Sequence, residues 1–112
     1  MQEDDLLVGL VQELRRGTIV LAVLSQLENP MYGYNLVTVL CEHGLPVEAN
    51  TLYPLLRRLE NQEVLQSSWE TTGAKPRKYY TITEKGRRVY GELKKVWATI
   101  NGSMDQLLNL HQ

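Results

Sequence analysis

The sequence contains no phenylalanine, one cysteine and only two histidines. A single cysteine, Cys41, cannot form a disulfide within the chain, and its place in an apolar helical pattern predicts a buried small side chain, with a redox role as the less favoured alternative. A zinc site needs three or four converging ligands, and neither His43 nor His111 has ligand-like neighbours in the sequence. We therefore expect no metal and no other cofactor.

Long hydrophobic runs and enzyme motifs are also missing. The longest apolar run, residues 19–24, is far shorter than the ~18 residues that a membrane span needs. The acidic start MQEDDLL does not resemble a secretory signal. The sequence has no glycine-rich phosphate loop, no Gly-x-Ser-x-Gly and no carboxylate pair in an apolar setting. These absences predict a cytoplasmic protein that is not an enzyme and does not contact membranes.

The charge is unevenly distributed along the chain, although its net value is only −1. Residues 1–49 carry two arginines and seven acidic residues, whereas residues 50–95 carry ten lysines and arginines and five acidic residues. Local fields matter more than total charge for binding phosphate groups. Residues 50–95 are therefore a candidate for contact with nucleic acid, and the alternative is an unevenly charged solvated surface.

Apolar residues recur with helical spacing over the first sixty residues. Leucines at steps of three and four predict a first helix over residues 5–27 that continues through Gly17. A second helix is predicted over residues 33–43. A short segment, GLPVE, joins it to a third helix that contains TLYPLLRRLE and runs to about residue 62.

The apolar spacing changes after the third predicted helix. Residues 64–70 and 77–83 interleave polar side chains with Val, Ile, Tyr, Thr and Trp around TTGAKP, which predicts a β-hairpin. Helical spacing then returns from Thr83, the expected N-cap, to residue 110, over ~40 Å. The predicted fold is mainly α with a small β-hairpin: a winged helix-turn-helix over residues 1–83 and a C-terminal dimerisation helix over residues 84–112, as a single unit.

The third predicted helix has one apolar and one polar face. At 100° per residue, its leucines gather on the face that would pack on the core. The opposite face carries Asn50, Pro54, Arg57 and Asn61, with Tyr53 beside it. Arginine pairs with guanine, asparagine pairs with adenine, and apolar groups contact the thymine methyl. This pattern is typical of a face that reads DNA.

Pro54 is unusual inside a helix. If Asn50 or Thr51 caps the helix, Pro54 lies in the first turn and removes at most one backbone hydrogen bond. If the helix starts near Glu48, the proline would tilt its first turn. Both starts place the perturbation at the end of the helix that would enter the major groove.

Four stretches of the chain resemble the PadR family of bacterial transcriptional regulators. They are RRGTIVLAVLSQL, MYGYNL, TLYPLLRRLE and KPRKYYTITEKG, in this order. The resemblance implies a winged-helix, DNA-binding homodimer that represses transcription and is released by a small molecule. Carried over by position, it implies that DNA is contacted by Asn50, Thr51, Tyr53, Pro54 and Arg57 and, from the wing, by Lys75, Arg77 and Lys78.

The final helix is too long for one small domain to cover. Its residues Val89, Val96, Ile100 and Leu107 follow a spacing close to the 3.5-residue repeat of paired helices. We expect it to pack against the first helix of a second copy, through Leu7, Leu14, Val96, Trp97 and Ile100. Trp97 would either fill this interface or line a pocket for a small aromatic effector.

Several residues have competing interpretations. Tyr79 and Tyr80 must point to opposite faces of a strand, so one should be core and one exposed. Tyr32 and Tyr34 are expected to be core or to buttress the second helix, and their alternative role is contact with phosphate. Arg58 would either face DNA or pair with Glu60 or Glu63. A winged helix that binds protein instead of DNA is the alternative function, and it would show an apolar or acidic face on the third helix.

Overall fold

The computed structural model describes residues 2–111 and contains five helices and one three-stranded sheet there. The elements are α1 (Glu3–Arg16), α2 (Ile19–Gln26), β1 (Met31–Tyr32), α3 (Gly33–Glu42), α4 (Ala49–Asn61), β2 (Leu65–Glu70), β3 (Arg77–Ile82) and α5 (Glu84–Leu108). Met1 and Gln112, the outer ends of the two predicted parts of the chain, lie outside the described residues. The predicted fold class is confirmed.

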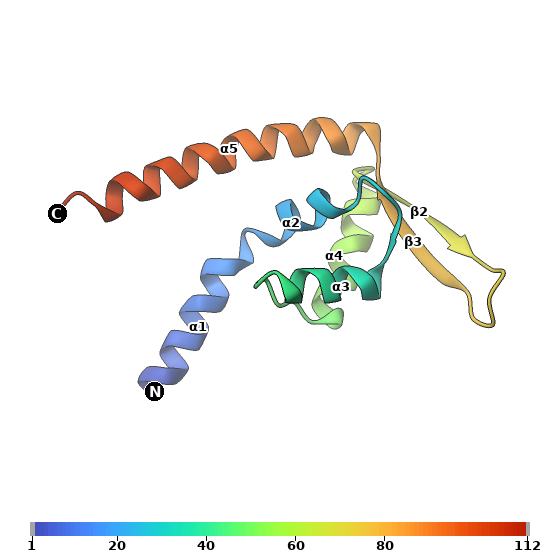
Figure 1. Ribbon diagram of the computed structural model, residues 1–112, viewed down its shortest axis with the longest axis horizontal. Helices are drawn as coiled ribbons and strands as arrows, with labels where there is room; N and C mark the ends of the chain where they lie inside the picture. Colours follow the sequence, from blue (N-terminus) through green and yellow to red (C-terminus); the bar gives the residue numbers. More distant parts are fainter. Residues whose placement is uncertain (1, 112) are drawn as a thin grey trace.

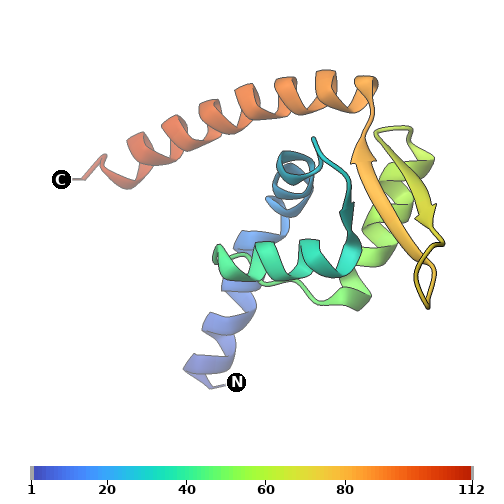
Figure 2. The same ribbon diagram turned by 45° about the vertical axis from the view of Figure 1, so that its right-hand side comes forward.

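A central body carries two projecting helices on one side and a hairpin on the other. Figures 1 and 2 show α2, α3, α4 and the sheet gathered together, while α1 and the far half of α5 extend away from them. The β2–β3 hairpin, the wing, points to the opposite end (Figure 1). The molecule is accordingly elongated, with extents of 59 × 36 × 22 Å. We call α1 and α5 the arms.

The hydrophobic core lies between α2, α3, α4 and the sheet. Leucines of α4 occupy its centre, and Leu52 and Leu56 have no solvent exposure. This confirms the apolar face predicted for the third helix. The buried core consists of Val23, Leu24, Leu27, Leu36, Leu40, Leu52, Leu56, Leu59, Val64, Leu65, Tyr80 and Ile82.

The prediction of one continuous first helix is wrong, because the chain forms two helices there. Thr18 ends α1: its amide and its hydroxyl both donate to the Arg15 carbonyl, at 3.0 and 2.7 Å. No described residue of α1 is buried, whereas α2 buries Val23 and Leu24. Both segments have leucines at helical spacing, but only α2 packs on the core. Periodicity marks apolar faces and does not reveal a change of packing partner at Gly17.

The sheet has a third strand that the sequence did not reveal. The strand order is β1-β3-β2, and β3 pairs antiparallel with both neighbours. The predicted hairpin is confirmed, with pairing from Leu65 opposite Ile82 to Glu70 opposite Arg77. The added strand β1 has two residues, too few to produce an alternating pattern.

Three single-residue predictions meet different outcomes. Tyr80 is core at 3% exposure, and Tyr79 lies half-buried on the other face of β3. Tyr34 is 71% exposed, so its expected packing role is wrong, and phosphate contact stays a prediction. Cys41 is also exposed, contrary to prediction, because it is turned by about 100° from Leu40, which carries the buried stripe of α3.

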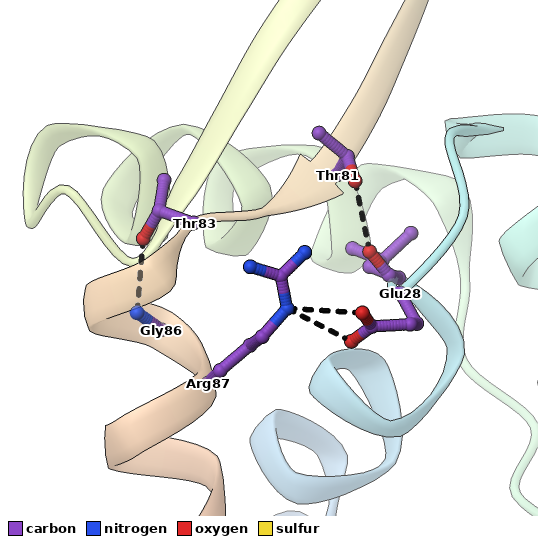
Figure 3. A network of polar contacts seen from close by, with 6 residues as sticks. Glu28, Thr81, Thr83, Gly86 and Arg87 are labelled. Atoms are coloured by element: carbon purple, nitrogen blue, oxygen red, sulfur yellow. Dashed lines mark hydrogen bonds and ion pairs between the residues drawn. The ribbon is translucent and has the colours of Figure 1, made fainter.

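The start of α5 is tied to the body by several polar contacts (Figure 3). The Thr83 hydroxyl accepts from the Gly86 amide at 2.9 Å, which confirms the predicted N-cap. Arg87 Nε donates to both carboxylate oxygens of Glu28, at 3.0 and 3.1 Å, and the Thr81 hydroxyl donates to the Leu27 carbonyl. These contacts set the direction in which the arm leaves the body.

None of the helices in residues 2–111 combines the length and the apolar character that crossing a membrane would require.

Candidate nucleic-acid interface

The solvent face of α4 is polar and basic, as predicted. Asn50, Thr51, Pro54 and Arg57 are all exposed, while the leucines on the other side of the helix hold it against the core. Because Leu52, Leu56 and Leu59 are buried, the helix cannot rotate without opening the core. The four exposed side chains therefore form a fixed surface, which offers an amide, a hydroxyl, an apolar ring and a guanidinium.

The structure selects the earlier of the two predicted starts for α4. Glu48 is the N-cap, without a side-chain capping bond, and its carbonyl accepts from the Leu52 amide at 2.9 Å. Pro54 is then the sixth helical residue and lies in the second turn. A proline has no amide hydrogen, so Pro54 cannot donate the helical hydrogen bond that the Asn50 carbonyl would otherwise accept. A backbone acceptor is left on the exposed face beside the Asn50 side chain.

Tyr53 is placed differently from its neighbours on α4. Its side chain is half-buried and packs against the buried core. It also lies close to Gly33, since a Cβ built on Gly33 would be 2.5 Å from Tyr53 Cε1. The close approach of α3 and α4 at this point requires glycine, and it fixes the tyrosine at the edge of the predicted DNA surface.

The basic residues of the wing differ in their partners. Lys75 and Arg77 are exposed. Lys78 is partly buried and donates to Glu60 Oε1 of α4 at 3.2 Å. Ser67 of β2 donates to the other oxygen of Glu60. One carboxylate on α4 therefore holds both strands of the wing.

These contacts shift the pKa values of the ion pair in opposite directions. The hydrogen bond from Ser67 lowers the pKa of the Glu60 carboxyl, partial burial opposes this, and the Lys78 ammonium lowers it further. Partial burial lowers the pKa of Lys78, but Glu60 and Tyr80 outweigh it, so the net shift is upward. Each partner stabilises the charged form of the other.

Arg58 does not form the ion pairs considered for it. Within residues 2–111, Glu60 pairs with Lys78, and Glu63 lies 3.9 Å from Lys85. The Arg58 side chain is exposed at the edge of α4.

A groove separates the wing from the first part of α3 and from α4. It has a volume of about 980 Å³, and we call it the wing groove. The structure brings four of the predicted DNA-contacting residues together in its walls, namely Tyr53, Lys75, Arg77 and Lys78. The other lining residues are Tyr32, Gly33, Tyr34, Asn35 and Pro76. The remaining predicted residues lie on the exposed face of α4.

Asn35 is a polar lining residue that the sequence analysis missed, and Tyr34 was expected to pack, with phosphate contact as its alternative. Both lie in the first turn of α3 and are exposed. The signal was present in YGYNL, because an asparagine and a tyrosine off the apolar stripe are polar groups on a solvent face. Only the fold shows that this face meets the wing.

The residues predicted for a dimer interface or an effector pocket lie on the arms. Leu7 and Leu14 of α1 are 61% and 78% exposed, and Val96, Trp97 and Ile100 of α5 are between 44% and 54% exposed. The two arms diverge from the body (Figure 1), so one copy of the chain does not bring these side chains together. No cluster of His, Cys, Asp or Glu in the described part of the chain has the make-up of a metal site.

A helix-turn-helix formed by α3 and α4, followed by a hairpin beside an exposed polar helix face, defines a winged-helix protein. The chain belongs to the PadR-like family of transcriptional regulators, whose family model matches residues 20–92. Members of this family are transcriptional regulators and not enzymes, which confirms the prediction of a non-enzymatic function.

Relatives and solved structures agree with this assignment. The transcriptional regulator Rv3488 of Mycobacterium tuberculosis is 32% identical over 83 residues, which cover 73% of this chain and 78% of that protein. A PadR family transcriptional regulator from Eggerthella lenta has a similar crystal structure, with 53% identity, a TM-score of 0.89 and 95% of each chain covered. Bacillus subtilis PadR, solved in complex with operator DNA, shares the fold at 21% identity, with a TM-score of 0.63 over 68% of this chain and 45% of that chain.

Proposed function

We propose that this regulator is a repressor that binds a near-palindromic operator as a homodimer, with α4 in the major groove and the wing beside it. The observation that carries the proposal is the fixed, exposed face of α4, which holds Asn50, Thr51, Pro54 and Arg57 next to the basic wing groove. A module that binds proteins would need an apolar or acidic surface there. The operator complex of Bacillus subtilis PadR supports the same use of the fold.

The proposed contacts divide into two kinds. Arg57 and Asn50 have the donors that read guanine and adenine edges, and Thr51 and Pro54 offer methyl and ring carbons to thymine. Lys75, Arg77 and Tyr53 line the wing groove and would contact the sugar–phosphate backbone. Lys78 would add positive potential there while remaining paired with Glu60.

Operator binding tests these assignments directly. Genomic DNA retained by the purified protein supplies the operator, and fluorescence anisotropy then gives its affinity. Arg57→Ala should cost about 1–3 kcal/mol and relax specificity at one base pair. Lys94→Ala removes an exposed charge from α5 and is the matched control, with no expected loss of specificity. Equal behaviour of the two variants would refute the placement of the DNA surface.

The wing lysines should respond to salt differently. Lys75→Ala should weaken binding to every sequence and lower the salt slope by about 0.9, the value for one lost phosphate contact. Lys78→Ala should lower the slope by less, because its ammonium is already paired with Glu60 at 3.2 Å. A larger loss at Lys78 than at Lys75 would contradict this division of roles.

The proposed dimer would bury the apolar side chains of the arms. Among residues 2–111, fifteen large hydrophobic residues are exposed, and thirteen of them lie on α1, α5 or directly after α5. Covering them with a second copy is expected to bury more than ~1,000 Å² in total. Sedimentation at micromolar concentration should give a dimer. Leu14→Glu should dissociate it, whereas Gln12→Glu on the same helix should not; a stable wild-type monomer would overturn the dimer proposal.

Symmetry then predicts the operator. A two-fold dimer presents two copies of α4, so the half-sites should lie about one helical turn apart, roughly 34–36 Å, or a multiple of it. Occupancy of such a site excludes polymerase from the same DNA, which is why we propose repression. Transcription in vitro from the retained promoter should fall as the protein is added, and a rise would indicate activation.

The effector site is proposed at Trp97, on the arm that would meet its symmetry mate. Indole rings at a two-fold seam can stack on a planar ligand. Aromatic cationic or phenolic compounds should quench Trp97 fluorescence and weaken operator binding, which requires tighter binding to the DNA-incompetent form. Trp69→Phe leaves Trp97 as the single emitter, and Trp97→Ala should abolish the quench. Quenching that survives in the Trp97 variant would place the sensor elsewhere.

The domain assignment is part of the same proposal. Residues up to 83 would act as the DNA-binding unit and α5 as the dimerisation helix, joined as one folded unit through Thr83 and Arg87. A protein that acts on chromosomal DNA works in the compartment that holds it, so we propose a cytoplasmic location.

A further inference from the structure

Two tyrosines and an arginine form a stack on the outer face of the sheet. Tyr32 of β1 is the cross-strand partner of Tyr79 of β3, their ring centroids lie 4.0 Å apart, and the planes differ by 26°. The Tyr79 hydroxyl donates to the Tyr32 hydroxyl. The guanidinium carbon of Arg77 lies 5.1 Å from the centroid of the Tyr32 ring. Tyr32 therefore contacts a second ring and a cation.

Core packing does not account for this stack. Tyr80, the next residue along β3, points to the opposite face and is buried at 3% exposure. Tyr32 and Tyr79 are half-buried and belong neither to the core nor to the hydrophobic side chains packed against it. The pair covers the outer face of the sheet at the point where the wing leaves the body. A role other than filling the core is needed to explain two stacked aromatic rings there.

The usual partner of Arg77 is turned away from it. Glu70 lies directly opposite Arg77 in the β2–β3 ladder, and opposite charges at such positions normally attract. The Glu70 carboxylate instead accepts from the amide of Thr72, at 3.0 Å, and from its hydroxyl. Within residues 2–111, Arg77 has no carboxylate within 4.0 Å. Its charge is held by the Tyr32 ring and is not neutralised by an acid.

The position of Arg77 gives this arrangement a use. Its side chain lines the wing groove together with Lys75 and Lys78. A free arginine side chain samples many rotamers and loses that freedom when it binds a ligand. A planar guanidinium stacked on a ring has already lost part of it, and its N–H groups remain available at the guanidinium edge.

We propose that Tyr32, braced by Tyr79, is a positioning residue that holds Arg77 for contact with a DNA backbone phosphate in the wing groove. This inference rests on the DNA-binding function proposed above and adds to it residues that do not themselves need to touch DNA. It separates the wing cations by role: Lys75 is a mobile charge, Lys78 is paired with Glu60, and Arg77 is pre-oriented.

A double-mutant cycle on DNA binding tests the proposal. The probe is a mixed-sequence duplex, because phosphate contacts do not depend on sequence, and anisotropy is recorded as a function of salt. Arg77→Ala should lower the salt slope by about 0.9. Tyr32→Leu should weaken binding by about two- to fivefold, the strength of an exposed cation–π contact. Tyr32→Leu combined with Arg77→Ala should be no weaker than Arg77→Ala alone.

Two matched variants distinguish positioning from general damage. Tyr32→Phe keeps the ring and loses the hydroxyl, so binding should stay close to wild type. Lys94→Ala breaks another cation–aromatic contact, 4.7 Å from the Tyr90 ring on α5, and should leave the slope unchanged. A thermal melt of each variant shows whether it is folded, and Tyr79→Leu replaces Tyr32→Leu in the cycle if the latter is unfolded.

A spectroscopic signature reports the stack without DNA. The Arg77 Nε–H resonance should be displaced by the ring current of Tyr32 in the wild type and in Tyr32→Phe, and should return to an ordinary position in Tyr32→Leu. Additive losses in the cycle, or an Arg77 resonance that ignores Tyr32, would overturn the positioning role. If the wild-type protein shows no salt-dependent binding to duplex DNA, the DNA-binding function itself is refuted. If the wild type binds normally and Tyr32→Leu binds equally well, only the positioning role is refuted.

Discussion

Gly86 in the first turn of α5 is the position where one methyl group should do the most damage. A Cβ built there would lie 2.2 Å from the carbonyl oxygen of Val64 and 2.6 Å from Ile82 Cγ1. The Val64 carbonyl also accepts from the Thr83 amide and hydroxyl, at 3.0 and 3.1 Å. Because the obstacle is backbone between α4 and β2, a side-chain rotation cannot relieve it. Gly86→Ala must move the start of α5.

The magnitude follows from opposing terms. Alanine favours a helix over glycine by up to about 1 kcal/mol. Against this, overpacking costs about 1–3 kcal/mol, and each weakened hydrogen bond around Thr83 costs about 0.5–1.5 kcal/mol. The cap bond from the Gly86 amide to Thr83 is among the bonds at risk (Figure 3). We expect a net destabilisation of about 2 kcal/mol or more, within the range of ordinary core damage.

The assay compares Gly86→Ala with Gly91→Ala in the same helix. Apart from its chain neighbours and the backbone of α5, no atom lies within 4 Å of a Cβ built at Gly91, so this control should stabilise the protein slightly through helix propensity alone. Thermal unfolding at one fixed protein concentration gives both values. Operator affinity, measured well below the melting temperature, should also fall for Gly86→Ala, since the arm direction would set the spacing of the two α4 helices.

The result that would refute this reasoning is a Gly86→Ala protein as stable as Gly91→Ala. Such an outcome would mean that α5 can leave the body along a different path at little cost. The arm direction would then not be fixed by the contacts around Thr83. A Gly86→Ala protein with normal stability but lost operator affinity would show that the arm moved without strain. The direction of the arm would then be set by the dimer interface.

Three further predictions concern the body. The pKa of Glu60 is lowered in the folded protein, so its ionised carboxylate stabilises the fold above the ordinary carboxyl pKa. This stabilisation is lost as the pH falls through the lower folded pKa. Urea titrations should show that Glu60→Gln loses this acid dependence, which is worth about 0.2–1 kcal/mol. Gly33→Ala should displace Tyr53, because the added Cβ would lie 2.5 Å from Tyr53 Cε1. It should weaken DNA binding in anisotropy while the protein stays folded by circular dichroism. Exposed Cys41 should react with a maleimide in the native protein as fast as in urea, in a mass-spectrometric time course.

The local patterns of the sequence were enough to predict the elements with regular apolar spacing or with capping and turn residues at their ends. The leucine spacing of α4 gave its buried face, and the opposite face followed with Asn50, Pro54 and Arg57 exposed. Thr83 is an N-cap because a hydroxyl before a helical run satisfies a free amide. The hairpin followed from two β-rich runs around a glycine loop. Each of these depends on neighbours within a few residues.

The split at Gly17, the strand β1 and the start of α4 depend on distant contacts. The leucines of α1 and α2 have the same spacing, yet α1 lacks a surface of the body to pack on. Two residues of β1 become a strand because Tyr79 and Tyr80 of β3 lie beside them. The earlier start of α4 left Pro54 in its second turn, which local preferences alone disfavour.

The candidate site shows the same division. Residue types alone were enough to predict an exposed polar face on α4 and a basic wing, because amides and guanidinium groups on a helix face are rarely core. The tertiary structure alone paired Lys78 with Glu60, exposed Tyr34 and Cys41, and stacked Arg77 on Tyr32. The partners in these two contacts, Lys78 with Glu60 and Arg77 with Tyr32, lie 18 and 45 residues apart in the sequence. Their meeting is set by how α4, β1 and β3 pack around the buried leucines, and a local pattern carries no information about that packing.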